Sequence, residues 1–388
     1  MSIFVQVSLI QIFFIALRLG CTSFGGPTAH LAYFQQTYVT DKKWLRAEEY
    51  ADLVALSQFL PGPASSQVGI GIGYKLRGII GSILAFIGFT LPSIVIMLLF
   101  AAFLQMTTLD LSWLQGLKLV AVAIVAHVIW DMSSKLLVSS QHIGLMVIVA
   151  VLSLLLKTPY AMIFIFLGVA LIGYFFFPAT ASKASVTVVG SVKSGGIALS
   201  VFFLLLFGLP LATSMLSNDT LSLFTSMYTA GALVFGGGHV VLPLLEAQFV
   251  QTGLMSTDAF LAGYSIAQAI PGPLFTFATY IGMVLDGVPG ALIATVAIFL
   301  PAFLLIIGVY PFWLRMGQHT GIRRAMSALN AAVIGILVAA FLSPIVSSTV
   351  TSAVDALIAL LLVTLLFTKK VSPLLLVLLG VVIGVAIY

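Results

Sequence analysis

The sequence has 388 residues, of which 61% are hydrophobic and 7% are charged, and its formal net charge is +5. Soluble domains carry about 25% charged residues, so this composition excludes a soluble globular protein and predicts an all-α integral membrane protein. The Lys and Arg residues stand in ones to threes at the ends of apolar segments, a spacing that sets membrane orientation and does not indicate a nucleic-acid partner. A single cysteine and five separated histidines provide no disulfide framework and no metal-ligand spacing, so we expect no bound metal and no cofactor.

The first apolar segment ends in an FGGP motif at residues 24–27. Glycine permits close or left-handed backbone and proline suits a first helical turn, so a new helix is predicted to start there. A PGP motif at residues 61–63 divides residues 47–76 into two apolar pieces too short to cross a bilayer, which predicts a re-entrant pair. About four spanning helices are predicted to follow, the first kinked at Pro92.

The same landmarks recur in the same order in the second half of the chain. FGGG at residues 235–238 repeats the first motif, and PGP at residues 271–273 repeats the second. The apolar stretch at residues 197–216 has no counterpart and would join the two copies. The predicted organisation is a first repeat over residues 1–177, a linker and connecting transmembrane helix over residues 178–220, and a second, inverted repeat over residues 221–388.

Charge placement favours opposite orientations for the two copies. Lys75 and Arg77 fall where the second copy has Asp286, and Arg323 falls where the first copy has no cation nearby. Equivalent loops of oppositely oriented repeats differ in this way, because cytoplasmic loops carry the excess of Lys and Arg. The linker at residues 178–196 is therefore predicted to be cytoplasmic.

The interruptions predict where a substrate binds. Non-helical backbone inside a bilayer is tolerated only where protein or a water-filled cavity satisfies the exposed N–H and C=O groups. Four helix N-termini would meet there, each carrying about +0.5 charge, which suits a dianion. The candidate substrate-binding residues are Ser23, Phe24, Gly25, Gly26, Pro27, Thr28, His30, Gln58, Pro61, Gly62, Pro63, Ser65, Ser66, Gly236, Gly237, Gly238, His239, Gln268, Pro271, Gly272, Pro273 and Thr276.

Three charged residues within apolar segments are candidates for proton coupling or charge compensation. Glu246 is the first candidate for a proton carrier, because an intramembrane carboxylate is costly and usually functional; the alternative is a carboxylate that reaches the outer surface. Arg18 either neutralises a bound oxyanion, snorkels to the interface or pairs with an acid. Lys118 either lines the path or is structural. His30 and His239 either contact substrate or carry protons, or are hydrogen-bonded core residues.

Four motifs in order resemble the chromate ion transporter family, in which long members have two homologous membrane halves. They are TSFGGPTAHL at residues 22–31, QFLPGP at 58–63, VFGGGHVVLP at 234–243 and QAIPGP at 268–273. The resemblance covers the whole chain and implies efflux of chromate across the bacterial inner (plasma) membrane, driven by the proton motive force and conferring chromate resistance. The second copy departs from the pattern at Gly238, where the first copy has Pro27.

Other functions remain open at this stage. Sulfate and related oxyanions share the charge and tetrahedral shape of chromate, so an oxyanion exchanger is the nearest alternative. An anion channel would use the same helix dipoles. A membrane-embedded enzyme is not expected, because flavin, haem and thiol signatures are missing, and no catalytic residue is assigned. The expected partners are the oxyanion, protons and the lipid bilayer, and a homodimer is left open.

Overall fold

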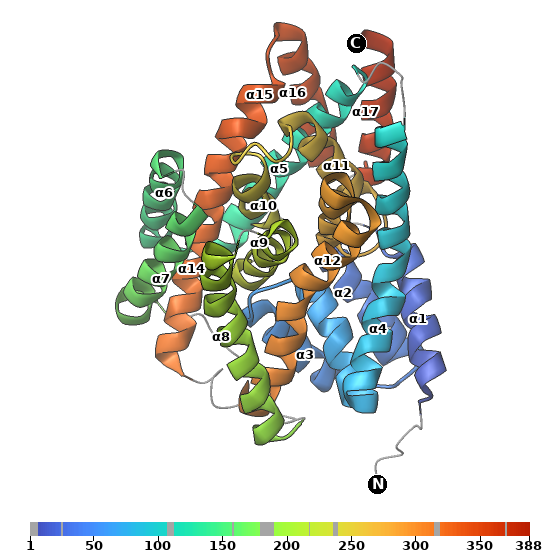
Figure 1. Ribbon diagram of the computed structural model, residues 1–388, viewed down its shortest axis with the longest axis vertical. Helices are drawn as coiled ribbons and strands as arrows, with labels where there is room; N and C mark the ends of the chain where they lie inside the picture. Colours follow the sequence, from blue (N-terminus) through green and yellow to red (C-terminus); the bar gives the residue numbers. More distant parts are fainter. Residues whose placement is uncertain are drawn as a thin grey trace.

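The computed structural model describes residues 7–24, 26–106, 112–156, 159–178, 190–216, 218–235, 240–313, 319–368 and 371–388, without the side chains of Thr28 and residues 159–163. These parts of the chain contain helices and no strand (Figure 1). The helices are α1 (Leu9–Thr22), α2 (Gly26–Phe34), η1 (Gln35–Asp41), α3 (Ala47–Phe59), α4 (Ala64–Met106), α5 (Leu114–Leu136), α6 (Ser140–Leu155), α7 (Pro159–Phe176), α8 (Val192–Met215), α9 (Asp219–Leu233), α10 (Val241–Phe249), α11 (Thr257–Ala269), η3 (Leu274–Thr276), α12 (Phe277–Val309), η4 (Tyr310–Phe312), α14 (Thr320–Ala340), η5 (Phe341–Val346), α15 (Ser347–Thr349), α16 (Ala353–Phe367) and α17 (Pro373–Ile387).

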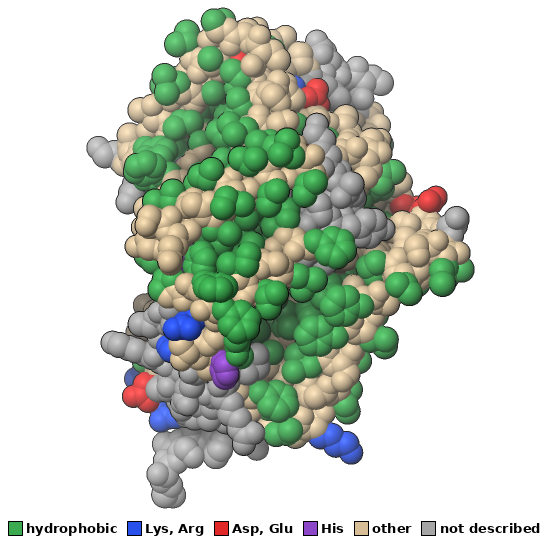
Figure 2. Space-filling model, turned by 90° about the vertical axis from the view of Figure 1, so that its left-hand side faces the viewer, with side chains coloured by type: hydrophobic (Ala, Val, Ile, Leu, Met, Phe, Trp, Pro, Cys, Tyr) green, Lys and Arg blue, Asp and Glu red, His purple; other side chains and the backbone are tan. Residues whose placement is uncertain are grey.

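Many of these helices are apolar over lengths that suit a lipid bilayer. Among the described residues, 5 helical segments are long and apolar enough to cross a membrane, and several shorter apolar helices accompany them. Large apolar side chains remain exposed along the outer faces of α4, α6, α8 and α16. The face drawn in Figure 2 is largely apolar, and most of its visible Lys and Arg side chains lie toward the lower end. The chain is therefore an all-α membrane protein, with lipid as the solvent for its sides.

Both long helices, α4 and α12, contain the same hinge. The backbone leaves helical angles at Arg77 (φ −146°, ψ 27°) and Gly78 (φ 61°, ψ −151°), and it repeats these values at Asp286 (φ −144°, ψ 28°) and Gly287 (φ 60°, ψ −151°). Only glycine adopts the second conformation without strain. Residues 79–106 keep helical angles through Pro92, where a kink was predicted, so the break in helical backbone angles of α4 lies at Arg77 and Gly78.

The two hinges lie at opposite ends of the molecule. The Arg77 side chain donates from Nε to the carbonyl of Val7, beside the N-terminus (2.6 Å). At the far end of the same helix, Gln105 Nε2 donates to the carbonyl of Met283 (3.2 Å), just before the second hinge. At about 1.5 Å rise per residue, residues 79–105 place the two equivalent hinges roughly 40 Å apart. The two copies therefore run in opposite directions, as the charge pattern predicted.

Each copy also packs its last two helices onto the other copy. Helices α6 and α7 lie against α14, while α16 and α17 lie against α5 (Figure 1). Small residues allow this approach: a Cβ at Gly116 of α5 would collide with the carbonyl oxygen of Gly380 in α17. The connecting helix α8 packs along α12. Because the last two helices of each copy pack against the other copy, the two repeats form one body around a shared centre.

Candidate functional site

The four chain interruptions meet in two crossed pairs. The N–H of Gly62, in the second interruption of the first copy, donates to the carbonyl of Val234, at the first interruption of the second copy (2.6 Å). The equivalent N–H of Gly272 donates to the carbonyl of Ser23 (3.1 Å). Each non-helical segment therefore satisfies a backbone group of the opposite copy, as burial of irregular backbone at membrane depth requires.

This meeting point lies midway between the two ends of the molecule. A Cβ added at Gly272 would lie 2.8 Å from Ser93 Oγ, and Ser93 stands halfway along residues 79–106. On the other side, a Cβ at Gly62 would lie 3.9 Å from the Cβ of Ala302 in α12. The crossed interruptions are therefore about 20 Å from either hinge, at the depth of the bilayer centre.

Local sequence explains how the interruptions form. Gly62 and Gly272 have φ values of 122° and 102°, which are conformations that favour glycine. The preceding residues, Leu60 and Ile270, are extended and end α3 and α11. Gln67 Nε2 then donates to the carbonyl of Pro61 (2.7 Å), so a side chain satisfies a carbonyl that the helix cannot. Both PGP motifs thus stop one helix and start the next.

In the first copy, polar side chains surround the interruptions. His30 Nδ1 lies 3.3 Å from Ser65 Oγ, so α2 and α4 are linked directly behind their N-termini. The His30 ring also forms a hydrogen bond with the backbone of Ser23 and packs edge-on against Phe89 (5.4 Å between ring centroids). His30 is therefore a buried, hydrogen-bonded side chain that holds three segments of the site together.

Four buried oxygen atoms at this position have no hydrogen-bond partner in the described part of the chain: Ser23 Oγ, Ser66 Oγ, Thr90 Oγ1 and Gln67 Oε1. Their residues are all at least 98% buried. A buried polar atom left without a partner costs about 1–3 kcal/mol, and native proteins keep few of them. The three hydroxyl groups are donors available to a buried anion.

The second copy does not repeat this polar lining. Phe275 stands at the position equivalent to Ser65, and Phe299 stands at the position equivalent to Thr90. Thr276 is equivalent to Ser66, but its hydroxyl donates to the carbonyl of Pro273 (2.8 Å). Within the described residues, the two crossed pairs are equivalent in backbone, but the hydroxyls of Ser65 and Thr90 have no counterpart in the second copy.

The remaining predicted site residues are spread more widely. Gln58 is exposed, whereas its equivalent Gln268 donates to the hydroxyl of Tyr264 (2.7 Å). Phe24 is 37% exposed beside the first interruption, and Arg18 is exposed on α1. Gly26, Pro27, Pro63, Pro271 and Pro273 lie within the interruptions or at the helix starts that follow them. Gly25, the Thr28 side chain, Gly236, Gly237, Gly238 and His239 lie outside the described residues.

The other two charged candidates are buried and paired. Glu246 is 3% exposed and accepts a hydrogen bond from Gln251 Nε2 at its Oε2 (2.9 Å), so it does not reach the outer surface. Lys118 forms an ion pair with Asp258 Oδ1 (2.9 Å). No group of three or more His, Cys, Asp or Glu residues within the described segments is arranged to hold a metal.

Thr90, Ser93 and Asp258 were missed by the sequence interpretation. Ser93 lies against Gly272 because α4 crosses the opposite copy, and its hydroxyl donates to the carbonyl of Thr90 one turn earlier; the local sequence does not predict that crossing. The one available signal was a pair of hydroxyl residues on either side of Pro92 in the otherwise apolar residues 83–104. Asp258 resembles an ordinary first-turn acid on α11, and only its partner on α5 distinguishes it.

Comparison with known proteins gives a consistent result. The family model described as "Chromate transporter" matches twice, at residues 10–174 and 221–385. A chromate transport protein of Pseudomonas aeruginosa is 26% identical over 339 residues, which cover 85% of this chain and 79% of that protein. A chromate transport protein of Cupriavidus metallidurans is 27% identical over 335 residues (84% and 80%). An uncharacterized transporter of Methanocaldococcus jannaschii is 30% identical over 339 residues (86% and 83%).

No solved structure matches the chain. The family model nevertheless accounts for both copies of the repeat and, with them, for all four interruptions that build the centre. On this basis the chain belongs to the chromate transporter family.

Proposed function

We propose that this protein is a secondary active transporter that exports chromate across the bacterial inner membrane in exchange for protons, and so confers chromate resistance. The observation that carries the proposal is the polar side of the centre, where the buried hydroxyls of Ser23, Ser66 and Thr90 have no hydrogen-bond partner among the described residues. A tetrahedral oxyanion accepts hydrogen bonds at four oxygens, so it matches this cluster of available donors.

The charge of a dianion is balanced by backbone dipoles. α2 begins at Gly26 and α4 begins at Ala64, and both N-termini adjoin the interruptions. Each such N-terminus contributes about +0.5 charge, and the low dielectric of a buried site strengthens the interaction. Close approach to these N–H groups requires glycine, which is the residue found at each interruption.

Proton coupling falls to Glu246 in this proposal. It is a buried carboxylate at the end of α10, and α10 is the helix that follows the first interruption of the second copy. A carboxylate in this position is costly when charged and takes up a proton readily when the local field changes. The Lys- and Arg-rich end, with Lys75 and Arg77, faces the cytoplasm, and the linker at residues 178–196 lies on that side.

Proteoliposomes preloaded with chromate test the proposal. We expect saturable chromate loss that accelerates when the external pH is lowered relative to the interior, and that empty liposomes do not show. Flux of sulfate with no flux of chromate would show that the substrate is sulfate and not chromate. Single-channel currents without saturation would make the protein an anion channel.

A further inference from the structure

The equivalent helices α3 and α11 are packed differently. On α11, Ser265 is fully buried and its hydroxyl donates to the carbonyl of Leu117 in α5 (2.6 Å). The equivalent face of α3, which includes Glu48, Ala51 and Gln58, is exposed. Among the described residues, α11 therefore packs onto α5 at one end of the molecule, whereas α3 makes no comparable contact with α14 at the other end.

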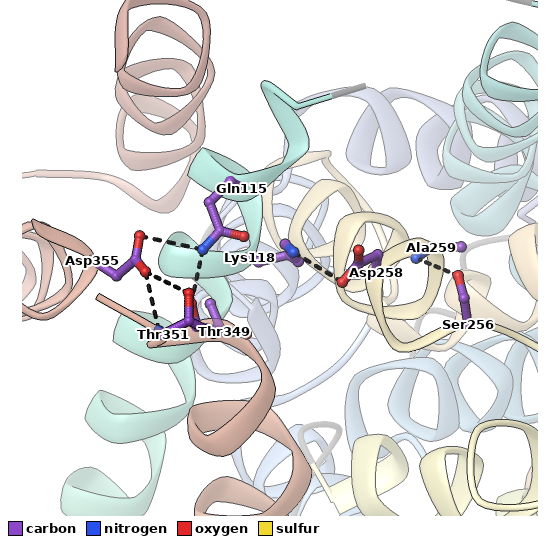
Figure 3. Close-up of polar contacts among 8 residues, drawn as sticks. All are labelled: Gln115, Lys118, Ser256, Asp258, Ala259, Thr349, Thr351 and Asp355. Carbon is purple, nitrogen blue, oxygen red and sulfur yellow. Dashed lines mark hydrogen bonds and ion pairs between the residues drawn. The ribbon is translucent and has the colours of Figure 1, made fainter. Parts of the chain in front are cut away.

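An ion pair spans the closed contact. Lys118 Nζ on α5 lies 2.9 Å from Asp258 Oδ1 on α11 (Figure 3). In the repeat, Asn330 is equivalent to Lys118 and Glu48 is equivalent to Asp258, so the other end has no matching lysine. The pair is uneven in exposure: the side chain of Lys118 is 11% exposed, while that of Asp258 is 62% exposed. The cation is fixed in the protein, and its carboxylate partner is held in solvent.

Lys118 also lines a cavity of about 860 Å³ at this end. Its lining includes the polar side chains of Gln115, Ser256 and Thr351 as well as apolar ones, and Lys118 is the only Lys or Arg among the described residues that line it. The second acid in the cavity, Asp355, accepts hydrogen bonds from Gln115 and Thr351 (Figure 3). It also accepts hydrogen bonds from the N–H of Ser352 and the hydroxyl of Tyr388. Hydrogen bonds from neighbouring groups therefore stabilise the charged Asp355 carboxylate, and Lys118 is the positive group that attracts an anion.

We propose that Lys118 is a second binding subsite for the transported tetrahedral dianion, in the outer cavity, and that Asp258 occupies it in the closed state as an internal substitute for the ligand. The proposal rests on the proposed function. A carboxylate presents two oxygens and one charge to Lys118, whereas the dianion presents more oxygens and two charges. An exposed carboxylate is screened and mobile, so the dianion can displace it.

Displacement has a structural consequence. Asp258 holds the first turn of α11 to α5, and Ser265, two turns later, holds the same contact. Once the dianion takes the place of the carboxylate, the first turn of α11 loses its ion pair to α5, while the Ser265 bond and the packing of α11 on α5 remain. The subsite therefore couples arrival of the anion at this end to loosening of the first turn of α11.

Three variants in the chromate flux assay test the proposal. Lys118→Gln removes the cation, and we expect KM for chromate to rise about tenfold, the effect of losing one charge-assisted hydrogen bond to the anion. Asp258→Asn removes the competing charge but keeps the shape of the side chain, and we expect KM to fall about threefold. Asp219→Asn, a change of the same charge outside the cavity, is the control and should leave KM unchanged.

The charge-reversed double variant Lys118→Asp with Asp258→Lys distinguishes loss of anion binding from loss of the structural ion pair. It restores an ion pair, so we expect wild-type thermal stability, but KM should stay raised because the cation now stands on the exposed side. Recovery of the wild-type KM by the double variant, or a raised KM in Asp258→Asn, would overturn the subsite. If the wild-type protein moves no chromate, the proposed function fails as well; wild-type flux with a normal KM in Lys118→Gln rejects the subsite alone.

Discussion

The N–H of Gly62 donates to the carbonyl of Val234 across the two halves of the protein, at 2.6 Å. The equivalent bond of the other pair joins the N–H of Gly272 to the carbonyl of Ser23. Each interruption is thereby completed by backbone from the opposite copy, so neither repeat can form the centre alone. The positive φ values of Gly62 (122°) and Gly272 (102°) explain why both copies carry a glycine between the two prolines.

The glycine at the polar side of the centre should not tolerate a side chain. Gly272→Ala places a Cβ 2.8 Å from Ser93 Oγ at a φ of 102°, so we expect chromate flux to fall at least tenfold and the free energy of unfolding to drop by about 1–2 kcal/mol. Flux in proteoliposomes and thermal unfolding in detergent measure the two effects. Gly253→Ala is the matched control, since Gly253 has a φ of 78° but nothing within 4 Å. It should lose stability and keep its flux; equal flux in both variants would remove Gly272 from the pathway.

Removing hydroxyls that have no internal partner should weaken binding without weakening the fold. Ser66→Ala and Thr90→Val are expected to raise KM for chromate by about 5- to 50-fold, with unchanged or slightly increased stability, because no internal hydrogen bond is broken. Thr279→Val is the contrasting variant, since the Thr279 hydroxyl bonds to that of Thr295 (2.7 Å). Its stability should fall by about 1 kcal/mol while KM changes little. A normal KM in both Ser66→Ala and Thr90→Val would place the anion elsewhere.

Neutralising the buried Glu246 carboxylate should make chromate transport independent of the pH gradient. Glu246→Gln keeps the size of the side chain and removes its titration, so we expect chromate flux that no longer responds to an imposed pH gradient. Initial rates at a fixed chromate gradient and varied pH gradient are the measurement. Glu48→Gln changes an exposed acid and should retain the full response. If Glu246→Gln responds like the wild type, another group carries the proton.

The Glu49 carboxyl should make stability depend on acid pH. Burial raises its pKa, but hydrogen bonds from the side chain of Lys75 (2.8 Å) and from the backbone and side chain of Arg46 outweigh this effect and lower the pKa from 4.5 to about 2. A lowered folded-state pKa stabilises the protein above pH 4.5, and this contribution is lost as the pH falls from 4.5 toward 2.

We therefore expect Glu49→Gln to lower the thermal midpoint at pH 7 and to flatten its decline at acid pH. Unfolding scans between pH 7 and pH 3 measure both. Asp131→Asn removes the exposed pair of Asp131 with Lys135 and serves as the comparison, with a smaller expected effect. An unchanged acid profile in Glu49→Gln would mean that other carboxyls set the decline.

The sequence by itself determined that the chain lies in lipid, that it contains a repeat and that the two copies run in opposite directions. Apolar length forces helices in lipid, and glycine and proline motifs restrict the backbone locally, so the interruptions at Gly62 and Gly272 could be predicted from residues close in the chain. The loop charges around Arg77 and Asp286 predicted that the two copies run in opposite directions, because membrane orientation depends on short segments. The kink at Pro92 stays a prediction, because the backbone keeps helical angles through that proline and departs from them at Arg77 and Gly78.

Tertiary structure alone decided which side of the centre is polar and which end is closed. Ser93 lies against Gly272 only because α4 crosses the other repeat, and Lys118 meets Asp258 only because α11 lies on α5. Such contacts join residues more than a hundred positions apart, and a single sequence carries no periodicity at that range. They depend on how two repeats with equivalent backbones but different side chains pack against each other, as at Ser65 and Phe275 or at Lys118 and Asn330.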